Sequence, residues 1–318
     1  MTEPGDTTSA DATANDTAAN DTISADAATS DDDWLELTGR AAFASHRMIG
    51  WIYWDPVAIE RYTALGPEQW SYYVASRGAA LADAGNQAVA AAFYSIHPGF
   101  IAMSLDNARD STTFEHVAAA RDAGVVAGLR ELTPEICGAL ADMAPELWAA
   151  ADALPMSGRV LAASLRGRPR PDDQLLSAWL AVDCIREWRG DTHWAIQLVD
   201  DLSDIATGIL DGAARDYPDD WLPRSRGADD AALHTAFAEL EARGLAADSK
   251  VNAAGLAHKA TLEARLDALS SVAWRALGAD TTRRFIELIE PVGDRFVERI
   301  DATAGPNWMP AARSRVAR

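Results

Sequence analysis

Charged and imidazole side chains gather in one stretch of the chain, residues 183–197. Within it, Arg186, Arg189 and His193 recur at intervals of three and four residues, which places them on one side of a helix. Guanidinium groups bind anions, and an imidazole can act as a base or a ligand near neutral pH. Gly190 in mid-helix lowers the stability of the helix by about 1 kcal/mol relative to alanine. We therefore expect another group to approach its backbone closely. The stretch predicts the floor of a pocket for a small anionic ligand.

The same stretch has a second interpretation in which it only stabilises the fold. The two guanidinium groups can pair with Glu187, Asp191 and the acids of other helices, and His193 can be a satisfied buried imidazole. Such a set is costly to bury unless its members pair or meet a ligand. Both interpretations require the groups to meet other helices.

A third interpretation is catalytic, with His193 and either Asp191 or Glu187 doing acid–base chemistry. The sequence has no phosphate-binding loop, dinucleotide fingerprint, nucleophile elbow or zinc-protease motif. Cys137 and Cys184 lie far apart and have no histidine at zinc-ligand spacing. The sequence therefore predicts no metal site and leaves any cofactor unidentified.

The elements that must position these groups are helices. Apolar spacing and cap-proline signals predict an all-α fold in which only one very short β-hairpin interrupts the helical pattern. The predicted helices cover about 35–53, 55–65, 68–83, 87–95, 111–132, 133–154, 158–165, 174–199, 203–214, 231–243, 254–277 and 281–300. An apolar piece near 100–105 and a linker at 217–227 complete the pattern.

Composition divides the chain into four parts. Residues 1–33 hold nine acids, no base and almost no large apolar side chain, which is typical of a disordered acidic tail. We expect a helical ligand-binding domain at 34–215, a winged-helix-like domain at 216–304 and a flexible C-terminal tail at 305–318. The net charge of −20 makes nucleic acid an unlikely partner. Without a signal peptide or an apolar run of membrane-spanning length, the chain is expected in the cytoplasm.

A specific phrase lies at the end of the helix predicted at 231–243, within the predicted winged-helix-like domain. Leu240-Glu241-Ala242-Arg243-Gly244-Leu245 is followed, ten residues later, by Gly255 and a leucine-rich helix. This pattern resembles MarR-type winged-helix regulators over about residues 231–300. The resemblance implies a recognition helix at 231–243 and a homodimer through 254–300.

The same region departs from those regulators where they grip DNA. The hairpin between residues 245 and 251 is too short to form a full wing. Acids flank the presumed recognition helix, which offers His234 and Thr235 where regulators present basic or amide side chains. Only Arg224 and Arg226, in the preceding loop, could reach a phosphate. We expect a degenerate winged helix that has lost DNA binding; in a working regulator these four residues would be the DNA contacts.

Phrases across the whole chain carry a second resemblance. Tyr72–Leu81, Gly158–Ala163 and above all Arg186-Glu187-x-Arg189-Gly190-Asp191-x-His193 resemble a family of actinobacterial helix-turn-helix proteins over about residues 35–300. The resemblance implies no particular reaction, but it implies that Arg77 and Arg159 belong with the 186–193 cluster. The chain departs from the family pattern at His46 and Trp188, so His46 receives no role. The predicted ligand-binding residues are Arg77, Arg159, Arg186, Glu187, Arg189, Asp191 and His193.

The leading hypothesis is a small-ligand-binding protein of winged-helix regulator ancestry. The first alternative is a ligand-responsive DNA-binding transcriptional regulator. The second is an enzyme that uses His193.

Overall fold

The first helix begins four residues earlier than its apolar pattern predicts. In the computed structural model, which describes residues 29–316, α1 (Asp31–Gly50) starts after Ser30, whose hydroxyl accepts the backbone N–H of Asp33. The carboxylate of Asp33 accepts the backbone N–H of Ser30 in turn, which completes a capping box. Three aspartates in the first turn also suit the positive end of the helix dipole. Most of the predicted acidic tail, residues 1–28, lies outside the described residues.

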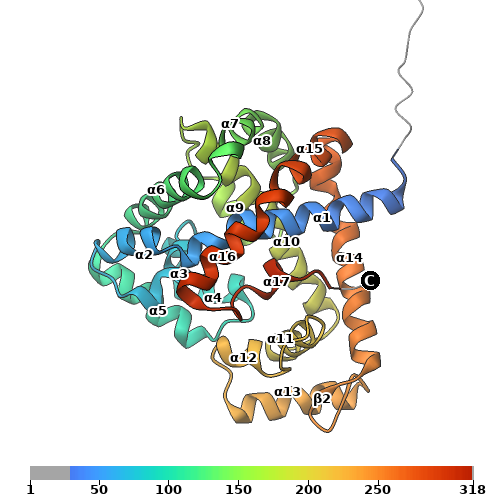
Figure 1. Cartoon of the computed structure of the whole chain (residues 1–318). Helices are drawn as coiled ribbons and strands as arrows, with labels where there is room; N and C mark the ends of the chain where they lie inside the picture. The colour runs from blue at the N-terminus through green and yellow to red at the C-terminus, as the bar shows by residue number, and fades with distance from the viewer. Residues whose placement is uncertain (1–28, 317–318) are drawn as a thin grey trace, which may run out of the picture.

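The described residues form an all-α fold, as the sequence predicts. In chain order the elements after α1 are η1 (Trp51–Trp54), α2 (Pro56–Thr63), η2 (Gln69–Ser71), α3 (Tyr72–Gly78), η3 (Ala82–Ala84), α4 (Asn86–Phe93), α5 (Pro98–Ser111), α6 (Phe114–Leu132), α7 (Pro134–Asp142), α8 (Ala144–Asp152), α9 (Val160–Arg166), α10 (Gln174–Val199), α11 (Asp204–Ala213), α12 (Trp221–Ser225), α13 (Asp230–Ala242), β1 (Ala246–Ala247), β2 (Lys250–Val251), α14 (Ala253–Leu277), α15 (Ala279–Ile289), η4 (Glu290–Val292), α16 (Gly293–Ala304) and α17 (Pro310–Arg313) (Figure 1). None of these helices is both long enough and apolar enough to cross a bilayer.

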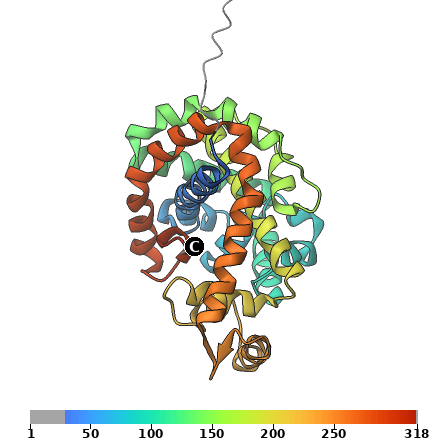
Figure 2. The ribbon, with the colours of Figure 1, turned by 90° about the vertical axis from the view of Figure 1, so that its right-hand side faces the viewer.

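Helix α1 runs through the middle of the molecule. Figure 2 looks nearly along it, and a ring of other helices surrounds it. It contacts α10, α14, α15, α16 and α17, and its buried Met48 and Ile49 belong to the same large core as Phe285 and Phe296. The C-terminal helices α15 and α16 therefore pack their apolar faces inside the chain, against its first helix.

A smaller core lies beneath the hairpin, at the lower end of Figure 1. Ile209 of α11, Leu240 of α13 and Leu262 of α14 are buried there beside Ile196 of α10. The strands pair antiparallel, with Ala246 opposite Val251. The turn residues Asp248 and Ser249 both have positive φ, as in the tight turn that a two-residue hairpin favours. Helices α10 and α14 span both cores and join them.

Proline accounts for two differences from the predicted helices. The helix expected at 133–154 is α7 and α8, separated at Met143, with Pro145 in the first turn of α8. The helix expected at 281–300 is α15 and α16, and Pro291 lies in the 3₁₀ turn between them. Proline lacks the N–H that a continuous helix needs and clashes with the preceding turn. The predicted linker also contains the short helix α12.

The described part of the C-terminal segment, residues 305–316, does not fray as expected. We call it the strap. Ala312 is fully buried, and its carbonyl accepts a 2.8 Å bond from Arg47 Nε of α1. Arg215, which follows α11, donates to the carbonyl of Ser314. Because arginine side chains satisfy its carbonyls, the strap is held on the body without being part of a longer helix.

Candidate functional site

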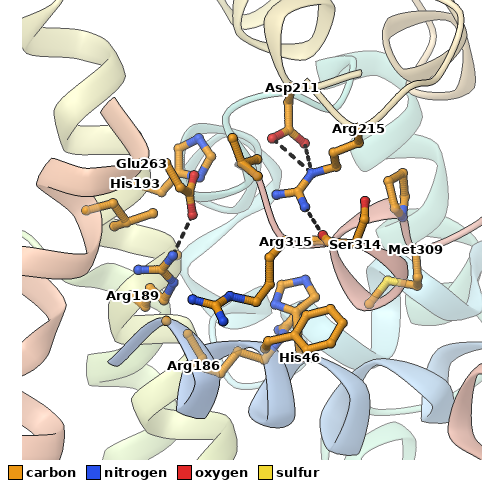
Figure 3. A pocket seen from close by; sticks show the side chains of 18 of the residues that line it. His46, Arg186, Arg189, His193, Asp211, Arg215, Glu263, Met309, Ser314 and Arg315 are labelled. Atoms are coloured by element: carbon orange, nitrogen blue, oxygen red, sulfur yellow. Dashed lines mark hydrogen bonds and ion pairs between the residues drawn. The ribbon is translucent and has the colours of Figure 1, made fainter. Parts of the chain in front are cut away.

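A cavity of about 210 Å³ lies between α1, α10, α11, α14 and the strap. Figure 3 shows side chains pointing into it from each of these elements. Its floor is the middle of α10, as the sequence predicts, and Gly190 of that helix borders it. A Cβ on Gly190 would meet Glu187 Oε2 at 3.3 Å, so glycine keeps this wall open beside a carboxylate.

Five of the seven predicted site residues line the cavity: Arg77, Arg186, Glu187, Arg189 and His193. Arg77 comes from α3 and the others from α10. The helical spacing brings the four α10 residues to one wall, and packing of α3 on the same side adds Arg77.

Two guanidinium groups hold Glu187. Arg77 Nε and Nη2 donate to its two oxygens at 2.8 and 2.7 Å, and Arg186 Nη1 donates to Oε1 at 2.5 Å. Burial raises the pKa of the Glu187 carboxyl, but Arg77 and Arg186 outweigh that effect and lower the pKa to about 2. Glu187 is therefore a fixed anion that orients two arginines. A carboxylate held in this way is a poor general base.

The opposite wall is a chain of alternating charges. Arg189 Nη2 lies 2.6 Å from Glu263 and its Nη1 lies 2.9 Å from Asp267, both on α14. The buried Lys259 bridges Glu263 at 3.3 Å to Asp211 of α11 at 3.0 Å. Burial raises the pKa of Glu263, but Lys259 and Arg189 more than offset it and lower the pKa to about 2. These pairs tie α10, α11 and α14 together around the cavity.

Two imidazoles face the same space. Burial, and then Lys259, lower the pKa of His193 to about 3, and its buried Nε2 has no hydrogen-bond partner among the described residues. Burial and the positive charge of Arg186, then of Arg215, hold the pKa of His46 well below its ordinary value. Both rings are therefore neutral at pH 7, and each can donate or accept one hydrogen bond per nitrogen.

Arg226 is the cavity arginine without a carboxylate partner among the described residues. Its Nη1 donates to the hydroxyl of Ser95 at 2.8 Å, and no ion pair within 4.0 Å involves it. Burial lowers the pKa of its guanidinium, and the charge of Asp211 offsets only part of this effect. Its neighbour Arg224 is exposed instead and pairs with Asp220 at 2.7 Å and Asp230 at 2.8 Å. Of these two predicted DNA contacts, Arg226 therefore faces the cavity and Arg224 faces outward.

Arg159 and Asp191 lie outside the cavity, on the side of α10 that packs against α9. Asp191 Oδ2 accepts the backbone N–H of Ala162 in the first turn of α9 at 3.1 Å, and Arg159 lies over the Trp188 ring. An α-helix has about 3.6 residues per turn, so consecutive residues of α10 point in different directions. Asp191 therefore points about a quarter-turn away from Gly190, which borders the cavity. The structure therefore gives no support to a pair between His193 and Asp191.

The lining carries more positive than negative charge. Among the described residues, six arginines line the cavity and four carboxylates do so, in a chain with a net charge of −20. Arg186 Nε and Trp194 Nε1 are buried donors without a partner there. No three metal-ligating side chains converge within residues 29–316. The cavity is therefore suited to an anion that can accept several hydrogen bonds.

Sequence reasoning missed part of this lining. His46 was set aside because its spacing departs from the family pattern, yet α1 carries it directly to the cavity. Arg215, Glu263 and Arg315 had no local signal, because each reaches the site from a different element. The helical period of α14, which places Lys259, Glu263 and Asp267 on one face, is the signal that could have identified that wall.

A family model described as a helix-turn-helix family matches residues 38–303. No curated protein and no solved structure matches the chain.

Proposed function

The chain belongs to this helix-turn-helix family, and on that premise we propose that its central cavity binds a compact anionic molecule. The observation that carries the proposal is Arg226, a half-buried guanidinium at the cavity wall that forms no ion pair with a carboxylate among the described residues. An uncompensated buried charge is strongly destabilising. An anionic ligand in the cavity removes that cost and also supplies acceptors for Arg186 Nε and Trp194 Nε1.

The size of the cavity restricts the ligand. Its volume of about 210 Å³ is below the roughly 300–1,000 Å³ of pockets for drug-sized molecules. Trp194 and Tyr73 provide apolar surface at the walls. We therefore propose a small carboxylate or phosphate ester rather than a nucleotide or a lipid.

The cavity borders the helix-turn-helix region. Asp211 belongs to α11 and Arg215 follows it, Arg226 follows α12, and Glu263 belongs to α14. The order α11, α12, α13, hairpin and α14 supports a winged-helix unit, as the MarR-type resemblance implies. A bound anion would connect this unit to α1 and α10.

Thermal unfolding with increasing inorganic phosphate or succinate tests the proposal. Both probes should raise the Tm of the wild-type protein, since a ligand at 100 times its Kd stabilises the native state by about 2.7 kcal/mol. Arg226→Gln should abolish that rise, and without ligand it should be about as stable as the wild type because it removes a half-buried charge that has no carboxylate partner.

Arg224→Gln is the matched control, two residues away. It breaks exposed ion pairs worth about 0–1 kcal/mol and should keep the full response to the probes. No rise in the wild-type Tm with either probe, or equal rises in all three proteins, would contradict the proposal.

A DNA-binding transcriptional regulator is the second candidate, and membership of a helix-turn-helix family favours it. The exposed His234 and Thr235 on α13 lie beside Glu241, and Arg224 is already paired. We propose that DNA binding has been lost; retention on heparin distinguishes the two candidates. The cytoplasmic location and the homodimer through 254–300 stay predictions.

A further inference from the structure

We propose that the strap, residues 305–316, is a lid over the anion cavity and that Arg315 on it binds the ligand. This inference rests on the proposed function for its ligand but on separate contacts for its motion. The strap follows α16 and crosses the cavity mouth, and Met309, Ser314, Arg315 and Val316 all line the cavity. The closed state in the structure therefore buries the site beneath the last residues of the described chain.

The first observation is a seat for the strap in α1. A Cβ on Gly50 would lie 2.1 Å from the methyl carbon of Met309, and its three nearest atoms would all belong to that side chain. The glycine thus opens a notch that the Met309 side chain fills. Met309 itself has φ 58° and ψ 57°, the left-handed region that is unfavourable for a residue with a Cβ. The strap is therefore seated in a specific position at some cost in backbone energy.

The second observation is that side chains at the edge of the molecule hold the strap. Arg47 donates to the Ala312 carbonyl, and Arg315 pairs with Glu36 at 2.9 and 3.0 Å. Glu36 is half exposed, and exposed ion pairs contribute about 0–1 kcal/mol. Trp308 packs between Trp54 and Trp221, with ring centroids 5.9 and 5.8 Å apart. Of residues 305–316 only Pro310, Ala312 and Val316 are buried, so the strap can separate from the body without unfolding α1 or α10.

The third observation is the direction of Arg315. Figure 3 shows its side chain reaching from the strap toward Arg186, Arg189 and His46. Each of these guanidinium groups is paired with a carboxylate, but a guanidinium has five N–H donors, so each can also donate to an anion that lies among them. With a ligand bound, Arg315 contributes a contact that exists only when the strap is closed, so ligand binding favours closure.

Hydrogen–deuterium exchange of the full-length protein tests the lid. Amides of residues 305–316 should exchange faster than those of α10 in the wild type, and inorganic phosphate should slow them. Gly50→Ala should speed their exchange without a probe, because Met309 loses its seat. Gly138→Ala is the control, since a Cβ there meets nothing within 4 Å, and it should leave the strap unchanged. Arg315→Gln should keep the fast exchange but lose the slowing by phosphate.

Each outcome decides one claim. If strap amides exchange only together with those of α10, or if Gly50→Ala leaves them unchanged, the strap is a fixed wall and the lid is wrong. If phosphate raises the Tm of the wild type but does not slow the strap, the ligand does not act through it. If phosphate does neither, the proposed anion site fails, and the strap is at most a segment that opens without a ligand.

Discussion

At the scale of single residues, two similar carboxyl groups of α10 have different pKa values because their environments differ. Glu187 and Asp191 are one helical turn apart, yet two arginines lower the pKa of Glu187 to about 2. Burial raises the pKa of Asp191 to about 7, and the bond from the Ala162 amide offsets only part of this. One carboxyl is a permanent anion at the cavity wall, and the other is half protonated at pH 7 beneath α9.

The raised pKa of Asp191 predicts a pH dependence of stability. Its value in the folded state, about 7, is above the ordinary 3.8, so the folded protein binds a proton that the unfolded chain releases. The stability from this group is complete below about pH 4 and is lost as the pH rises to 7. Asp191→Asn should remove this loss, so the variant should gain in unfolding free energy over the wild type between pH 4.5 and 7.5.

Urea denaturation at three pH values in that range measures the effect. Asp172→Asn, a substitution at an exposed position just before α10, is the control. Its unfolding free energy should change with pH in the same way as that of the wild type. If the unfolding free energy of Asp191→Asn also changes with pH as that of the wild type does, the Asp191 carboxyl has an ordinary pKa in the folded protein.

Residue patterns predicted part of the site for a physical reason. The period of α10 fixes which of its side chains share a face, so Arg186, Arg189 and His193 could be grouped from sequence. Nothing in the sequence records which helix packs on each face, so Arg159 and Asp191 were placed in the cavity although α9 covers them.

At the scale of elements, α13 decides whether the molecule can bind DNA. Its exposed positions include Ala231, Ala238 and Glu241 in addition to His234 and Thr235. Base and phosphate contacts depend on arginine, lysine and amide side chains, none of which α13 exposes within its bounds. If α13 is the recognition helix, as the MarR-type resemblance implies, it exposes none of the side chains on which those contacts depend.

Chromatography on heparin tests this at low salt, where attraction to a polyanion is strongest. The wild type should pass straight through, as should Arg224→Gln. Retention that weakens with salt and is reduced by Arg224→Gln would instead support the DNA-binding regulator.

Element boundaries were predictable where a local signal sets them. Proline and a cap residue mark the start of α2, and Asp173 caps α10 with bonds to the backbone N–H groups of Leu175 and Leu176. The start of α5 at Pro98 was missed, because His97-Pro98-Gly99 was interpreted as a turn. The strap was misjudged because its anchors are distant: Arg47, Arg215 and Gly50 lie far from it in sequence.

At the scale of the whole molecule, the charge distribution is the central feature. The chain as a whole repels anions, while its cavity gathers six arginines around four carboxylates. We propose that this long-range repulsion, combined with the local excess of donors, favours small anions that can enter the cavity over polyanions such as DNA.

Crystals soaked in sodium selenate test this claim most directly, because selenate has the shape and charge of a small oxyanion and its selenium gives an anomalous signal. We predict that the strongest selenium peak lies inside the cavity, in contact with Arg226 and at least one other lining arginine. Selenium peaks confined to the outer surface, with the cavity empty of anomalous density, would contradict the account.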